Sequence, residues 1–177
     1  MAARSPSIAC IGVIGRRNNP LHITSFAAEG SKEQRSRLEI SLLLNACLDI
    51  FESRMARQPV DSNLGLLHAI DERLALYGWL TNTGVKLVIG VDMEGRDAVP
   101  AEGKYPMLMG LRDADLKPAF RALQTAYIRL LRNPFYDPDD ADPRRSRGRQ
   151  STQITSALFI DEVDRIGRLW YPGIGEM

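Results

Sequence analysis

The stretch LGLLHAI-DER-LALYGWL-TNTG-VKLVIGV, residues 64–91, decides the fold. It contains three apolar runs, 64–70, 74–80 and 85–91, which short polar turns separate. Runs of this length, rich in aliphatic and aromatic residues and bounded by short turns, are typical of β-hairpins. Gly84 provides the left-handed backbone position that a three-residue hairpin loop requires. We therefore expect three consecutive antiparallel strands in this part of the chain.

A second hairpin is expected near the N-terminus. Residues 7–14 form a compact apolar run of the kind that indicates a buried strand. The polar cluster 15–20 follows as a turn, and Leu21 and Ile23 then alternate with polar residues in 21–26. Such alternation indicates a strand with one buried face. We therefore expect 7–14 and 21–26 to pair with each other.

Three helices are predicted outside these strands. The stretch 32–57 contains no Gly or Pro, and Ser31 is a candidate N-cap for a long helix there. A second helix is predicted to start at an Asp115 cap and to end before the Asn-Pro pair at 133. A third is predicted at 151–166. Consecutive hairpins with helices on both faces of the sheet describe an α+β sandwich of the profilin-like or longin-like kind.

The whole chain, 1–177, is expected to form a single domain of this kind. A long loop is predicted at 92–110, where glycines and prolines recur. A charged loop at 137–150 carries four Asp and then four Arg, so it is zwitterionic and not a basic patch. The tail, 167–177, is expected to be irregular.

Composition excludes several classes of function. The formal net charge of +1 removes the usual electrostatic argument for a nucleic-acid-binding protein. No apolar run approaches the length of a membrane span, and no secretory signal peptide is expected. The two cysteines, Cys10 and Cys47, lie in apolar contexts and are expected to be reduced core residues of a cytosolic protein.

No catalytic, cofactor-binding or metal-binding site is predicted. The sequence contains no phosphate-binding loop, zinc-protease motif, Cys-x-x-Cys pair or nucleophile elbow. His22 and His68 are the only histidines, and both fall in predicted strands. A small enzyme that used either would need it to converge with a cysteine or with Asp49 or Asp92.

The first predicted helix is the candidate interaction surface, because its middle is apolar almost all round. A surface helix normally has one apolar stripe. If Leu38 and Leu42 pack on the sheet, a second apolar set has no partner within the domain. The candidate interface then comprises this second set and the polar residues beside it: Leu43, Asn45, Ala46, Cys47, Asp49, Ile50 and Phe51.

Asp49 has two alternative interpretations. It is either an ordinary solvent-facing residue of the helix, or an acid at the centre of a surface that pairs with a donor on a partner. A buried charge without a partner costs several kcal/mol, so the second interpretation requires a partner that satisfies it. The apolar residues around Asp49 favour that second interpretation.

Three stretches resemble the sedlin family of TRAPP (trafficking protein particle) subunits. They are IGVIG at 11–15 followed by NPL at 19–21, LYGWLTNTGVK at 76–86 with Asp92 beyond it, and NPFYDP at 133–138. The resemblance implies a longin-like fold with a five-stranded antiparallel sheet. It places the first helix on one face of the sheet and the last two helices on the other.

The resemblance also implies a function. Members of this family are non-catalytic adaptors in a tether and guanine-nucleotide exchange factor for Rab-family GTPases in ER-to-Golgi and intra-Golgi transport. It implies other TRAPP subunits as direct partners, Rab GTPases as indirect ones, no cofactor, and a cytoplasmic protein held at Golgi and ER–Golgi membranes through the complex only. The resemblance further implies that the acid of the first helix, here Asp49, lies on the family's partner-contact side. The alternative is a longin-type regulatory domain that binds a SNARE or a small GTPase outside TRAPP.

Overall fold

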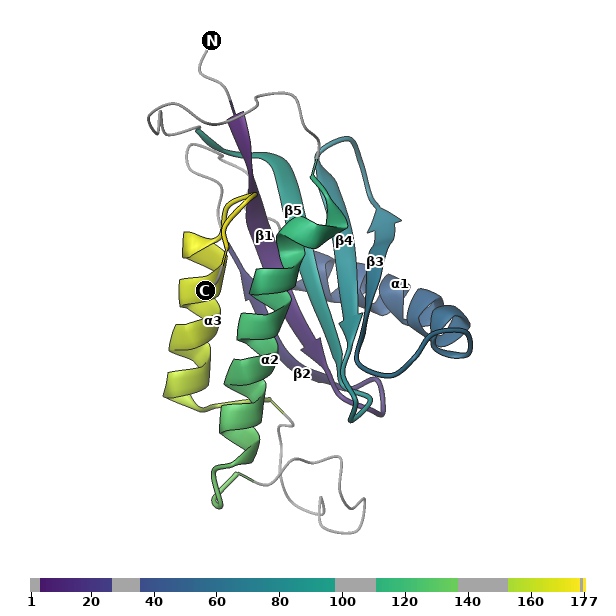
Figure 1. Cartoon of the computed structure of the whole chain (residues 1–177), viewed down its shortest axis with the longest axis vertical. Helices are drawn as coiled ribbons and strands as arrows, with labels where there is room; N and C mark the ends of the chain where they lie inside the picture. The colour runs from purple at the N-terminus through teal and green to yellow at the C-terminus, as the bar shows by residue number, and fades with distance from the viewer. Residues whose placement is uncertain (1–3, 27–35, 98–110, 137–152, 176) are drawn as a thin grey trace.

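The fold is a five-stranded antiparallel sheet with helices on both faces (Figure 1). The computed structural model describes residues 4–26, 36–97, 111–136, 153–175 and 177. The strand order is β2-β1-β5-β4-β3. The elements are β1 (Arg4–Ile14), β2 (Pro20–Ser25), α1 (Arg37–Met55), β3 (Ser62–Ala69), β4 (Leu74–Leu80), β5 (Lys86–Asp97), the 3-10 turn η1 (Asp113–Leu116), α2 (Lys117–Leu131) and α3 (Ala157–Leu169). Helix α1 covers one face while α2 and α3 cover the other, so the predicted α+β longin-like arrangement is confirmed.

Two strands are longer than the sequence pattern predicts. β1 begins at Arg4, and β5 continues to Asp97, into the stretch that was expected to be loop. The two extensions pair with each other, since Arg4 lies opposite Asp97. Pairing with a neighbouring strand thus keeps polar residues extended where composition alone indicates a loop. The remainder of the predicted 92–110 loop, 98–110, lies outside the described residues.

The helix boundaries differ from expectation at three points. The Ser36 hydroxyl accepts the Glu39 amide at 3.2 Å and caps α1, whereas the expected cap at Ser31 lies outside the described residues. Asp115 does not cap α2, because its carboxylate instead accepts the Arg112 amide at 2.9 Å within the 3-10 turn. α3 begins six residues later than predicted, at Ala157. The backbone just before α3 instead bonds to the edge of the sheet, where the Ile154 amide donates to the Leu21 carbonyl of β2 at 2.8 Å.

α3 also extends to Leu169, beyond its predicted end and into the stretch that was expected to be irregular. Trp170, which follows it, is fully buried. Its indole nitrogen donates to the Asp115 carbonyl at 3.0 Å, which ties the end of α3 to the start of α2. The predicted charged loop at 137–150 lies outside the described residues.

The alternation of side chains in β5 divides the core into two layers. Leu87, Ile89 and Val91 pack against α2 and α3 in the larger layer. Val88 points the other way and joins the smaller layer beneath α1. Successive strand residues point to opposite faces, so one apolar strand serves both layers.

Glycines in the sheet allow α1 to approach closely. Gly12 of β1 and Gly78 of β4 both lie opposite Val88, one on each side of it. A Cβ atom at Gly12 would lie 2.7 Å from Leu44 Cδ1, and one at Gly78 would lie 2.8 Å from Phe51 Cζ and 2.6 Å from Leu67 Cδ1 of β3. Leu44 and Phe51 are seven positions apart, which corresponds to about 10.5 Å along the helix. Gly12 and Gly78 lie two strand spacings apart, about 9.6 Å across the sheet. The match explains why α1 lies across the strands in Figure 1.

We predict that Gly78→Ala destabilises the protein by about 1–3 kcal/mol, because the new methyl group overpacks the seat of α1. Part of the penalty should disappear in a Phe51→Leu background, which removes the ring atom 2.8 Å from the new methyl group, and part should remain because Leu67 Cδ1 lies 2.6 Å from it. Urea unfolding of the four proteins in this cycle measures the coupling. Gly175→Ala is the control, since a Cβ there meets nothing within 4 Å. Equal costs in both backgrounds would contradict the proposed contact.

A second prediction concerns the loop between β4 and β5, where Gly84 has the positive φ of 82° that its sequence context predicts. Gly84→Val should cost ~1 kcal/mol or more, because a β-branched residue is strained in this region. For a chain of this size, a loss of 1 kcal/mol corresponds to a fall in melting temperature of about 2–4 °C. Differential scanning calorimetry beside Gly175→Val measures the difference. An unchanged melting temperature would show that the loop tolerates side chains there.

Candidate interaction surface on helix α1

The inner face of α1 is formed by residues spaced four, three and four apart, which are Ile40, Leu44, Cys47 and Phe51. Cys47 and Phe51 are fully buried. The expectation that these two belong to an exposed surface is therefore wrong, because they face the glycine-bearing strands, whereas the expectation that Cys47 is a reduced core residue is confirmed. Burial raises the pKa of the Cys47 thiol to about 11, so the thiol stays protonated and unreactive at neutral pH.

Leu38 and Leu42 have the opposite orientation from the one expected. Each precedes a buried residue by two positions, and two helical positions differ by about 200° around the axis. Their side chains are consequently 71% and 61% exposed. The leucines that were expected to hold the helix on the sheet instead form part of its outer surface.

Five exposed residues follow one another along this outer surface. We call Leu38, Leu42, Asn45, Ala46 and Asp49 the outer stripe. Leu43 and Ile50 of the predicted interface are only half-buried, and they pack at the flanks of the core beneath α1. The structure therefore brings Asn45, Ala46 and Asp49 together as expected, adds Leu38 and Leu42, and removes Cys47 and Phe51.

The chemistry of the outer stripe suits a protein partner. Leu38 and Asp49 are eleven positions apart, which corresponds to about 16 Å along the helix. Among the described residues, the Asp49 carboxylate has no hydrogen bond or ion pair. The stripe thus offers two leucines for apolar contact and an acid that can accept hydrogen bonds from an arginine or lysine.

The C-terminal half of α1 is fixed to the sheet by polar contacts. Arg54 donates through Nη1 to the Leu64 and Leu66 carbonyls of β3, at 2.7 and 2.8 Å. Asn18, in the turn after β1, donates to the Glu52 carboxylate at 3.1 Å. The Asn18 side-chain oxygen, Oδ1, accepts a hydrogen bond from the Lys86 ammonium at 2.9 Å. These contacts hold the C-terminal end of α1, next to Asp49 of the outer stripe, in place on the sheet.

The sheet edges are less suited to binding than α1. Arg54 occupies two carbonyls of the edge strand β3, and the β3 register shifts twice along its length. At the other edge, Ile154 bonds to β2. Bulges and covering groups of this kind blunt an edge against added strands. A helical surface is therefore the better candidate.

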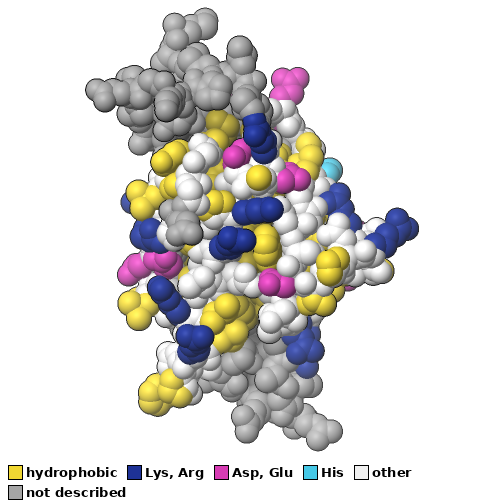
Figure 2. Space-filling view, in the orientation of Figure 1, with side chains coloured by type: hydrophobic (Ala, Val, Ile, Leu, Met, Phe, Trp, Pro, Cys, Tyr) yellow, Lys and Arg dark blue, Asp and Glu magenta, His cyan; other side chains and the backbone are white. Residues whose placement is uncertain are grey.

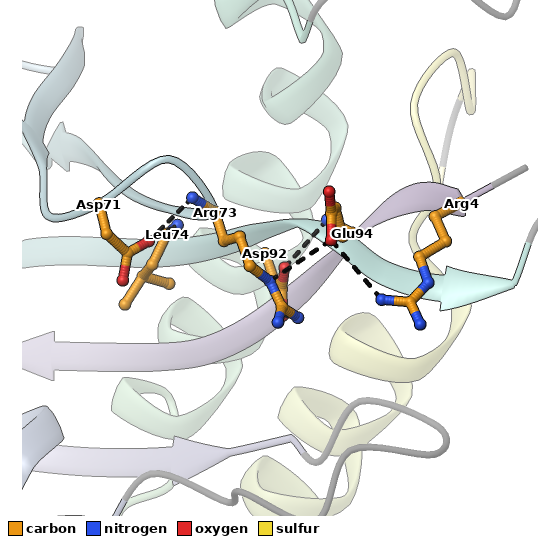
Figure 3. Close-up of polar contacts among 6 residues, drawn as sticks. All are labelled: Arg4, Asp71, Arg73, Leu74, Asp92 and Glu94. Atoms are coloured by element: carbon orange, nitrogen blue, oxygen red, sulfur yellow. Dashed lines mark hydrogen bonds and ion pairs between the residues drawn. The ribbon is translucent and has the colours of Figure 1, made fainter.

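A chain of alternating charges crosses the sheet near the start of β1 (Figure 3). Arg73, before β4, contacts Asp92 at 2.9 Å and Glu94 at 3.8 Å, and Arg4 of β1 contacts Glu94 at 3.6 Å. The hydrogen bond to Asp92 raises the pKa of Arg73. Exposed pairs of this kind contribute little stability each. Asp92, singled out in the sequence, thus bonds an arginine of the same sheet.

The two histidines do not converge. His22 lies on β2 and His68 on β3, at opposite edges of the sheet, and four strand spacings separate these edges by about 19 Å. Burial lowers the pKa of His22, although Asp164 opposes that shift. Within the described ranges, no group of three or more His, Cys, Asp or Glu could hold a metal ion. No helix of the described part has the length and apolar character needed to cross a membrane.

Comparison with known proteins gives a consistent result. The family model described as Sedlin matches residues 13–168. The trafficking protein particle complex subunit 2-like protein of Dictyostelium discoideum is 30% identical over 162 residues, which cover 90% of this chain and 95% of that protein. The protein of the same name from Mus musculus is 31% identical over 156 residues, covering 85% of this chain and 96% of that protein.

The two sides of α1 should respond differently to substitution. Phe51→Ala should destabilise the fold by about 3–5 kcal/mol because it leaves a cavity above Gly78. Leu42→Ser should change stability by no more than about 0.5 kcal/mol, since its side chain is solvent-exposed. Chemical denaturation of both variants tests this. A large loss for Leu42→Ser would mean that α1 is rotated relative to the orientation described.

Proposed function

Because the chain belongs to the sedlin family, we propose that it serves as a non-catalytic subunit that assembles or stabilises a TRAPP complex. Relatives that match almost their full length are named as subunits of the trafficking protein particle complex. A subunit of this kind needs a surface for its neighbours. The observation that carries the proposal is the outer stripe of α1, where two exposed leucines precede an acid that has no partner among the described residues.

The outer stripe has the composition expected of a small protein contact. Leu38 and Leu42 can be removed from water by a neighbour, which is favourable at about 25 cal/mol per Å² of apolar surface. Asp49 then lies beside the apolar contact, where a donor on the neighbour fixes the register. The polar anchors at Arg54 and Glu52 keep this surface in place without the neighbour.

The finer role follows from the family resemblance. The complex would be the tether and exchange factor that acts on Rab-family GTPases in ER-to-Golgi and intra-Golgi transport. This chain would contact other TRAPP subunits directly and Rab GTPases only indirectly. It would reach Golgi and ER–Golgi membranes from the cytoplasm as part of that complex. The names of the relatives and the three family-like segments support this role.

The decisive variant is Asp49→Tyr, which removes the charge and adds bulk at the C-terminal end of the outer stripe. We expect recovery of neighbouring TRAPP subunits to fall at least ~10-fold, the size of effect typical of an interface residue that carries much of the binding energy. Circular dichroism should show an unchanged fold, because Asp49 is exposed. Affinity purification from the source cell, with identification of co-purifying chains, measures the loss.

Glu72→Tyr is the matched control, since Glu72 is an exposed acid between β3 and β4, outside α1. It should recover the same subunits as the parent chain. If Asp49→Tyr folds and binds as well as the parent, the interface lies elsewhere. If the parent recovers a SNARE or a small GTPase without any TRAPP subunit, the chain is a longin-type regulatory domain instead.

A further inference from the structure

The outer face of α2 is basic along its whole length. From Lys117 to Tyr136 the chain carries four basic residues and no acid. All four, Lys117, Arg121, Arg129 and Arg132, are exposed. The opposite side of the helix is buried in the larger core layer. α2 is therefore an amphipathic helix whose polar face is cationic.

Apolar side chains protrude from the same layer. Phe135 is 92% exposed and Leu158 is 84% exposed. α2 ends and α3 begins at the same end of the molecule (Figure 1), and Phe135 follows the end of α2 while Leu158 lies in the first turn of α3. Ile128 and Leu169 are further exposed apolar residues on the two helices.

An ordered turn displays Phe135. Its amide donates to the Asn133 side-chain oxygen at 3.1 Å, and the Tyr136 amide donates to the Asn133 carbonyl at 3.0 Å. Tyr136 packs against the core while Phe135 points into solvent. This turn lies in the NPFYDP segment of the sequence. The segment lies outside α1, so the proposed protein contact of α1 does not explain it.

The acids of α3 offset the basic face only in part. Glu162 is paired with Arg165, at 2.6 and 2.9 Å, and it also acts electrostatically on Arg129 of α2, so three of the four basic residues of that helix remain. Asp164 acts electrostatically on His22 of β2, which places it toward the sheet. Asp161 is the one fully exposed acid of this helix. Figure 2, which views this side of the molecule, shows Lys and Arg side chains interspersed with hydrophobic ones and with some Asp and Glu side chains.

We propose that the face formed by α2 and α3 docks directly on an anionic membrane surface. Each part of the face suits a lipid headgroup layer: arginines bind phosphates, and exposed Phe and Leu side chains enter the interface. The pattern differs from the centre of a protein interface, where apolar groups are contiguous and charges are depleted. Here Ile128 and Leu169 each stand next to an arginine in the chain.

This membrane contact lies on the opposite side of the sheet from the outer stripe of α1 (Figure 1). It adds a direct lipid contact to the membrane association through the complex described above. It does not rest on the TRAPP assignment, because vesicles that contain no protein can test it. Failure of either proposal leaves the other standing.

The experiment is flotation of the full chain with vesicles of phosphatidylcholine alone or mixed with phosphatidylserine. We expect binding to the anionic vesicles only, and release when salt rises from about 0.1 to 1 M, which shortens the screening length from about 10 to 3 Å. Arg121→Glu with Arg132→Glu should weaken binding at least ~10-fold. Phe135→Ser with Leu158→Ser should weaken it measurably at unchanged charge.

The matched control is Arg57→Glu with Val60→Ser, which changes an exposed arginine and an exposed apolar residue in the connection after α1. It should bind vesicles with at least half the affinity of the parent. Absence of binding by the parent chain, or equal binding by all variants, overturns the proposal. If vesicles do not bind but the charge-reversed variant loses a co-purifying acidic protein, the face belongs to that protein and the membrane proposal is wrong.

Discussion

The close contact between α1 and the glycines of the sheet is the constraint on which the arrangement of this domain depends. Leu44 and Phe51 occupy space that a side chain at Gly12 or Gly78 would otherwise fill. This contact sets the direction of the helix across the strands and its rotation about its own axis. The rotation in turn determines that Asp49 and the two leucines Leu38 and Leu42 face solvent.

The strands could be predicted well because their information is local. β4 begins and ends at the predicted residues, since polar turns bound it on both sides. The positive φ of Gly84 likewise follows from its own short loop. The extension of β5 could not be predicted, because it depends on pairing with residues at the other end of the domain, near Arg4.

The orientation of α1 could not be predicted from the helix alone. Because apolar residues surround the middle of the helix, no single direction stands out as the buried one. The missing signal lies in other segments of the chain, at Gly12 and Gly78, which mark where a helix can approach the sheet. The exposure of Asp49 and Asn45 could be predicted because polar residues recur at helical spacing, whereas Cys47 and Phe51 were assigned to the wrong side.

Arg54 of α1 donates to two carbonyls of the edge strand β3. The same helix therefore protects both a strand edge and the core layer beneath it from solvent. If α1 detaches, even briefly, the apolar core beneath it becomes accessible and two edge carbonyls lose their donor at the same moment. A single local opening therefore exposes both features that promote aggregation, an apolar surface and an unpaired strand. A partner that clamps α1 lowers the population of such open states by mass action. Assembly would then protect the chain from aggregation, and the orphaned subunit would be the vulnerable species.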